Sequence, residues 1–231
     1  ATLNLEKLLV FTKLMELNTL SKRISSQLEE FNASKTFKND HGQSISSDNY
    51  QVIQTEDALS DWCEKIVNQK FFAIDTETTS LDTLSAELVG VSICIGSGNA
   101  CYIPIAHQTD EPEYKDLEKN QLDRSVVLKK LRPLLADRSI LKIGHNIKYD
   151  IKVLDKYQCP VNSFDDTMLM SHCINAGRER HSLDSITKNL LNHETIKLKD
   201  LIGSGKKERN FKDIPINLAA KYAAEDADMT F

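Results

Sequence analysis

The sequence predicts an α/β protein in which helices flank a mixed β-sheet, preceded by a helical extension at the N-terminus. In the central part of the chain, short apolar runs bounded by turn residues come first. Longer segments with helical periodicity follow them. Strands and helices that share one chain segment in this way are typical of α/β domains.

The first fifty residues are expected to form the helical extension and a linker. Apolar residues recur at roughly helical spacing from residue 3 to about residue 30. From residue 31 to residue 50 the composition turns to Asn, Ser, Lys and Asp, which is typical of a connecting segment. We therefore interpret residues 1–50 as the tail of a preceding domain and residues 51–231 as the main domain.

The main domain is expected to begin with a helix and three strands. The helix covers residues 57–68 and leads into an apolar strand at residues 71–75. Two further strands, at residues 88–95 and 100–105, are joined by Gly-Ser-Gly-Asn, which is a strong turn signal. The three strands are predicted to form a meander.

Helical periodicity dominates the rest of the chain. Helices are predicted over residues 122–135, 147–156, 166–175, 183–192 and 217–231, with one short strand at residues 140–144.

Composition and charge exclude some classes of protein. A formal charge of -5 and a pI near 5.7 argue against a protein that coats nucleic acid by bulk electrostatics. They do not exclude an enzyme that holds phosphates through metal ions. Five cysteines without a Cys-x-x-Cys pair indicate a reducing compartment, and no apolar run is long enough to span a membrane. We expect a cytoplasmic location.

Two carboxylates end the first predicted strand. Asp75 and Glu77 lie two residues apart, so the period of a strand directs both to the same side. Two adjacent anions are unfavourable unless a proton or a cation relieves them, so the pair is a candidate seat for a divalent metal. An ordinary polar strand end is the alternative.

Further candidates follow along the chain. Asp150 comes after the short strand at 140–144, where α/β folds collect functional groups, although a helix cap or an ion pair is the alternative. Tyr222 and Asp226 are four residues apart in an alanine-rich segment, which places them on one helix face. Glu225 and Asp228 are expected to belong to a solvated acidic face.

These motifs, in this order, resemble the proofreading 3′–5′ exonuclease domain of family-A DNA polymerases of the bacterial DNA polymerase I type. Four strings carry the resemblance, which runs from about residue 51 to residue 231. They are Phe-Ala-Ile-Asp-Thr-Glu-Thr at 72–78, Gly-His-Asn-Ile-Lys-Tyr-Asp at 144–150, Phe-Asp-Asp-Thr-Met-Leu at 164–169 and Tyr-Ala-Ala-Glu-Asp-Ala-Asp at 222–228. The resemblance implies a ribonuclease H-like mixed sheet flanked by helices.

The resemblance also implies a catalytic centre. Asp75, Glu77, Asp150 and Asp226 fall on four acids that hold two divalent ions in that family, and Tyr222 falls on the tyrosine that orients the attacking water. Asp75 is expected to bridge both ions, with Glu77 and Asp226 at one site and Asp150 at the other. Oxygen ligands alone suit Mg²⁺ or Mn²⁺.

Five further residues match positions that hold DNA in the family. Thr78 and Leu81 are expected to clasp the terminal nucleotide, although Leu81 could instead belong to the core. Asn146 matches a position near the substrate strand or caps the following helix. Arg180 matches an arginine that can touch phosphate, and Leu198 replaces a frequent aromatic, which leaves an apolar contact in place of stacking.

The expected function is therefore that of a 3′–5′ exodeoxyribonuclease acting on single-stranded or frayed DNA. The resemblance implies a covalently linked polymerase domain, which we expect to lie outside these 231 residues. A ribonuclease D-like exoribonuclease is one alternative. A structural module without catalytic activity is another.

Overall fold

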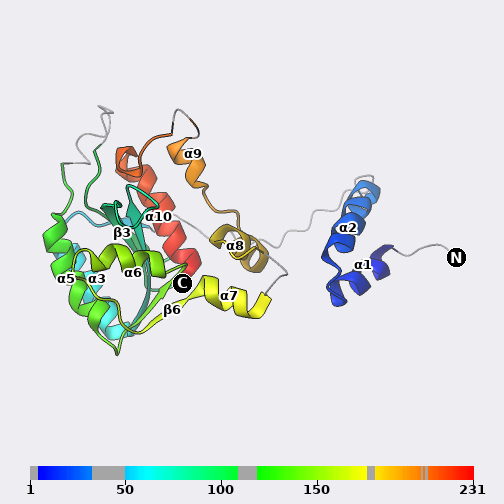
Figure 1. The fold of residues 1–231 in the computed structure, drawn as a ribbon, viewed down its shortest axis with the longest axis horizontal. Coiled ribbons are helices and arrows are strands. Elements are labelled where there is room, and N and C mark those ends of the chain that lie inside the picture. Colours follow the sequence, from blue (N-terminus) through cyan, green and yellow to red (C-terminus); the bar gives the residue numbers. More distant parts are fainter. Residues whose placement is uncertain (1–4, 33–49, 109–118, 176–179, 204, 206–207) are drawn as a thin grey trace.

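The computed structural model describes residues 5–32, 50–108, 119–175, 180–203, 205 and 208–231 (Figure 1). Most of the predicted linker, residues 33–49, lies outside the described residues. The N-terminal extension contains two helices that pack on each other, α1 (Leu5–Leu14) and α2 (Asn18–Asn32).

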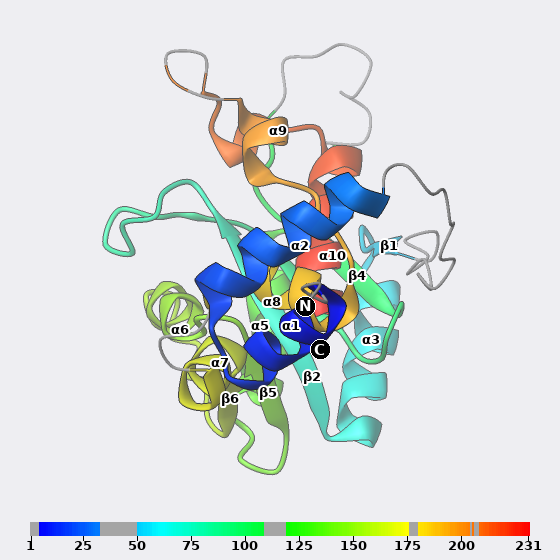
Figure 2. The ribbon, with the colours of Figure 1, turned by 90° about the vertical axis from the view of Figure 1, so that its right-hand side faces the viewer.

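A six-stranded mixed sheet forms the centre of the main domain. Its spatial order is β1-β4-β3-β2-β5-β6, and the strands are β1 (Gln51–Val52), β2 (Phe71–Thr78), β3 (Leu88–Cys94), β4 (Ala100–Pro104), β5 (Leu141–Gly144) and β6 (Phe164–Asp166). β2 pairs antiparallel with β3 and parallel with β5. Figure 2 shows β5 and β6 on one side of β2 and β4 with β1 on the other. The predicted α/β class and meander are confirmed.

The helices follow the predicted order. They are α3 (Glu56–Gln69), α5 (Arg124–Ala136), α6 (Lys148–Asp155), α7 (Thr167–Asn175), α8 (Leu183–Leu191), α9 (Leu198–Ile202) and α10 (Ile216–Thr230), with a 3₁₀ turn at Phe211–Asp213. The strand β1, the short α9 and the 3₁₀ turn were not predicted.

The prediction that a helix begins at residue 166 was wrong, because residue 166 is the last residue of the short strand β6. β6 continues through Asp166 because it pairs in parallel with β5. The Asp166 carboxylate then accepts hydrogen bonds from the backbone N–H groups of Met168 and Leu169, at 2.9 and 3.3 Å, and so starts α7 one residue later.

The two faces of the sheet carry different side chains. Alternate β2 residues Phe72 and Ile74 pack with Trp62 of α3 and Leu131 of α5 in the larger core cluster. The other set includes Ala73, which packs against Ala224 and Ala227 of α10. In Figure 1 α3 and α5 lie on one side of the sheet and α10 on the other. The period of two therefore sends Asp75 and Glu77 to the face that α10 covers.

Candidate active site

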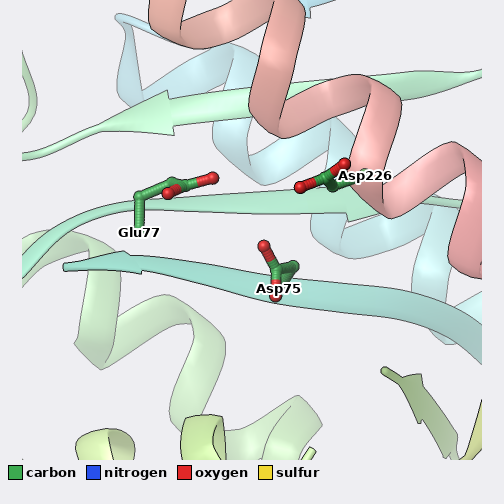
Figure 3. A group of neighbouring side chains, drawn as sticks. All are labelled: Asp75, Glu77 and Asp226. Carbon is green, nitrogen blue, oxygen red and sulfur yellow. The ribbon is translucent and has the colours of Figure 1, made fainter. Parts of the chain in front are cut away.

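Three carboxylates converge between β2 and α10. Asp75 and Glu77 come from β2, and Asp226 comes from the helix that covers it (Figure 3). One oxygen from each lies within 4.8 Å of the others. The expectation that Asp75 and Glu77 share one side of the strand is confirmed.

Small side chains allow this convergence. Ala224 and Ala227 of α10 pack on Ala73 of β2 and on Ala100 of β4, and all four are buried. Alanine gives a short distance between helix and sheet and has high helix propensity. Asp226 therefore reaches the strand acids, although it lies far from them in the chain.

The fourth acid, Asp150, approaches β2 from its β5 side. The pairing of β2 with β5 ends at Ala73 and Ile143, so the backbone N–H of Thr76 has no strand partner there. Asp150 Oδ1 accepts that N–H at 3.0 Å and the Thr76 hydroxyl at 2.5 Å. Asp150 is buried in the first turn of α6, and its carboxylate acts as neither the N-cap nor an ion-pair partner.

A glycine sets the position of α6 against the strand that precedes it. A Cβ atom on Gly144, the last residue of β5, would lie 2.7 Å from Cβ of Ile147. Any other residue here would push the start of α6 outward. The absence of a side chain thus brings Asp150 close to Thr76.

Burial raises the pKa of all four carboxyls, and repulsion by neighbouring carboxylates adds to the effect at Glu77, Asp150 and Asp226. Desolvation is the largest cause in each case, and it raises the pKa of Asp75 to about 7. The pKa of Glu77 lies well above its ordinary value because of burial and then of Asp75, Asp226 and Asp150. Burial and the charge of Asp75 act in the same direction on Asp150 and Asp226. Such a site favours a proton or a cation.

The donor set fits a hard divalent cation. The cluster offers carboxylate oxygens and no sulfur or imidazole. Glu77 Oε1 is buried and has no hydrogen-bond partner in the protein, which fits an oxygen that serves as a cation ligand. Within the part of the chain that the structure describes, this is the one such grouping of three or more potential ligands.

Tyr222 lies one helical turn before Asp226, close enough for the Asp226 carboxylate to influence the pKa of its phenol. Burial is the main cause that raises the pKa of Tyr222, and the charges of Asp226 and Glu77 act in the same direction. The phenol therefore remains protonated at neutral pH. It can donate or accept a hydrogen bond, but it is not available as a phenolate base.

The acids lie in a groove of about 760 Å³. One wall is the segment 78–81 at the end of β2, and another is built from α9 and residues 208–211. Asn210 Nδ2 donates to the Thr79 carbonyl oxygen at 2.8 Å and links the two walls. Four of the five residues expected to hold substrate, Thr78, Leu81, Asn146 and Leu198, line this groove.

The structure decides between the alternative roles of some of the residues expected to hold substrate. Leu81 is 90% exposed, which excludes the alternative that it belongs to the core. The Asn146 side chain accepts a hydrogen bond from Lys148 Nζ, and it makes no capping bond to α6. Leu198 is 37% exposed on its wall. Arg180 is exposed and lies outside the residues that line the groove.

Sequence reasoning assigned no role to two residues beside the acids. Tyr149 donates a hydrogen bond to the Ser80 carbonyl oxygen at 2.5 Å and bonds with Thr78 Oγ1, which holds the segment after β2. Its place in the string at 144–150 was the available signal. Asn210 carried none, because it lies in a loop that pairs with a distant segment.

The expectation of a solvated acidic face for Glu225 and Asp228 was wrong. Both are buried, with 6% exposure. Asp228 accepts hydrogen bonds from Tyr50 Oη and the Gly98 N–H, each at 2.8 Å. The side chains of Glu225 and Asp228 do point away from Asp226, but they are packed against other parts of the protein and do not face water.

This fold and site define a ribonuclease H-like nuclease, and comparison with known proteins gives the family. The profile of a 3′–5′ exonuclease family matches residues 50–231, so the chain belongs to that family. DNA polymerase I of Pseudomonas aeruginosa is 40% identical over 184 residues, which are 78% of this chain and 20% of that protein. DNA polymerase I of Rhizobium leguminosarum is 38% identical over 192 residues, covering 78% and 19%. The chain spans about a fifth of the length of these relatives.

Solved structures of other nucleases share the fold. NrnC of Brucella melitensis superimposes with a TM-score of 0.54 at 24% identity, covering 78% of this chain and 74% of that one. RNase D of Escherichia coli gives a TM-score of 0.55 at 23% identity, covering 78% and 42%. The predicted ribonuclease H-like fold is confirmed. Among the described helices, none combines the length and apolar composition needed to cross a bilayer.

Proposed function

We propose that this chain is the 3′–5′ exonuclease domain of a DNA polymerase I-type enzyme. It removes deoxynucleoside 5′-monophosphates one at a time from the 3′ end of single-stranded or frayed DNA. The observation that carries the proposal is the convergence of Asp75, Glu77 and Asp226 within 4.8 Å at the base of a groove. The similarity to two DNA polymerases I at 38–40% identity supports the choice of DNA.

The acids would hold two divalent cations of the Mg²⁺ or Mn²⁺ type. Asp75, Glu77 and Asp226 would bind one, and Asp75 with Asp150 would bind the other. When bound, such a pair supplies positive charge that activates water and stabilises the leaving 3′ oxygen. The raised pKa values support this assignment, because clustered anions become stable once cations neutralise them.

The reaction is hydrolysis. Water oxygen adds to the phosphorus of the last phosphodiester, the bond from phosphorus to the 3′ oxygen breaks, and that oxygen gains a proton. Tyr222 would orient the water, and its position near Asp226 with a protonated hydroxyl supports this role. Thr78, Leu81 and Leu198 line the groove where the terminal nucleotides would bind, and Asn146 lies in the same lining. Arg180 remains a proposed phosphate contact outside it.

A matched pair of oligonucleotides tests the proposal. Single-stranded DNA and RNA of the same sequence, labelled at the 5′ end, are incubated with the protein and Mg²⁺, with and without EDTA. The expected result is stepwise shortening of DNA with release of 5′-monophosphates, and no shortening in EDTA. A preference for RNA would instead favour a ribonuclease D-like activity, for which the shared fold with RNase D gives a reason.

Failure of both substrates with Mg²⁺ and with Mn²⁺ would favour a structural role. The presence of all four acids in one place argues against that role.

We also propose that this domain is part of a longer polymerase chain. The relatives are about five times as long as this chain, which supports a covalently linked polymerase domain. Proofreading would then be the role of this domain, in the cytoplasm. We retain the division into residues 1–50, the tail of a preceding domain, and residues 51–231, the exonuclease domain.

A further inference from the structure

Glu225 makes contacts that the proposed chemistry does not use. It follows Tyr222 in α10 and immediately precedes Asp226, but its side chain is directed elsewhere. Its Oε1 lies 2.9 Å from His193 Nε2, and its Oε2 accepts the backbone N–H of Ile196 at 2.6 Å. Both partners lie in residues 192–197, the connector between α8 and α9.

The connector leads directly into one wall of the groove. Leu198 is the first residue of α9 and lines the groove with Ile202 at the other end of that helix. Leu201 and Ile202 pack against the core cluster that contains Phe211 and Ala219. The far end of α9 is therefore held by apolar packing, whereas Glu225 holds the end that carries Leu198.

The choice of an acid at this position has an electrostatic cost. The Glu225 carboxylate contributes to the raised pKa of Asp226, so it adds negative charge beside a cluster that is already acidic. A buried carboxylate is tolerated when directed donors satisfy it. Glu225 has two such donors, one for each oxygen, and both belong to the same connector.

We propose that Glu225 is a positioning residue for the substrate groove. It ties the connector to the helix that carries Tyr222 and Asp226, and so sets the distance between the Leu198 wall and the catalytic acids. This inference rests on the proposed exonuclease function. It assigns Glu225 to substrate binding and not to the chemical step.

The test separates binding from chemistry in the full chain. KM and kcat for a single-stranded DNA oligonucleotide are measured with Mg²⁺ for wild type, Glu225→Ala and Glu225→Gln. We expect Glu225→Ala to raise KM roughly tenfold, because two hydrogen bonds to the connector are lost. kcat at saturating substrate should stay within about twofold. Glu225→Gln can still accept the Ile196 N–H, so it should restore most of the wild-type KM.

A matched control uses the same connector. Glu194 pairs with Lys188 at 2.8 Å, and both side chains are well exposed. Glu194→Gln should leave KM and kcat unchanged. A rise in KM of the same size in this variant would overturn the proposal, because the effect would then follow from any charge change on the connector.

Two further measurements keep the result decisive. Amide hydrogen exchange at Ile196 should be faster in Glu225→Ala, and this readout does not depend on activity. If Glu225→Ala does not fold, His193→Ala removes one half of the contact, and an unchanged KM in that variant overturns the proposal. An unchanged KM in a folded Glu225→Ala does the same. A wild-type chain that fails to cleave DNA refutes the proposed function, while the exchange data still decide whether Glu225 holds the connector.

Discussion

Replacing Asp75 with asparagine should abolish cleavage and yet stabilise the protein in the absence of divalent cations. The asparagine side chain would keep nearly the same shape but would remove one negative charge from the cluster with Glu77 and Asp226. Cleavage should be lost because the central carboxylate for cation binding is gone. Stability should rise because the buried charge of Asp75 is removed, and because the remaining acids are relieved of its repulsion.

The size of the effect follows from the pKa of Asp75, which burial raises from 3.8 to about 7. A difference of about 3 pKa units corresponds to about 4 kcal/mol of unfavourable ionisation above pH 7. Coupling to Glu77 shares this energy among several carboxyls, so we expect a gain of about 2 kcal/mol for the variant. That corresponds to an increase in Tm of roughly 4–8 °C for a chain of this length.

The dependence on pH has a definite sign. Because the folded-state pKa is raised, the unfolded chain ionises first, and wild-type stability in EDTA is lost as pH rises from about 4 through about 7. The variant lacks this part of the loss. The Tm difference between Asp75→Asn and wild type should therefore be small at pH 4.5 and largest at pH 8.

The assay is thermal unfolding in EDTA and in Mg²⁺, with a nuclease assay on the same preparations. Asp61→Asn serves as the control, since Asp61 is an exposed carboxylate on α3 that does not line the groove. Mg²⁺ should raise the Tm of wild type and of Asp61→Asn more than that of Asp75→Asn. A lower Tm for Asp75→Asn at pH 8 in EDTA, or retained cleavage, would refute the reasoning.

Three other substitutions test separate contacts. Thr76→Val removes the hydroxyl that donates to Asp150, so Mn²⁺ binding measured by calorimetry should weaken by roughly 5- to 30-fold. Thr76→Ser keeps the hydroxyl and should bind Mn²⁺ nearly as well as wild type. Equal affinity in Thr76→Val and wild type would contradict this role. Tyr222→Phe should lower the cleavage rate by up to about 100-fold with little change in Tm, and an unchanged single-turnover rate would exclude an orienting role. Lys142 is fully buried and donates to the carbonyl oxygens of Leu134, Asp137 and Ile140. Lys142→Met should therefore lower the unfolding free energy measured in urea by about 2–4 kcal/mol. Lys152 is exposed, so Lys152→Met should cost little.

Local patterns predicted most of the elements and the identity of the acids. Helical and strand periodicities depend on neighbours within a few positions, so α3, β3 and β4 were found close to their observed bounds. β1 and β6 were missed because they have two and three residues and exist through pairing with distant strands. The burial of Glu225 was missed for the same reason, since its partners lie about thirty positions away.

The sequence by itself determined the α/β class, the family resemblance and the set of four acids with a tyrosine, because each is encoded in short strings. Only the tertiary structure decided that Asp226 lies beside Asp75 and Glu77, that Thr76 holds Asp150, and that Leu81 is exposed. The physical reason is that the direction of a side chain follows from the periodicity of its own helix or strand. The distance between side chains on different elements depends instead on how closely those elements pack. The alanines of α10, the glycine that ends β5 and the early end of the β2–β5 pairing set that distance.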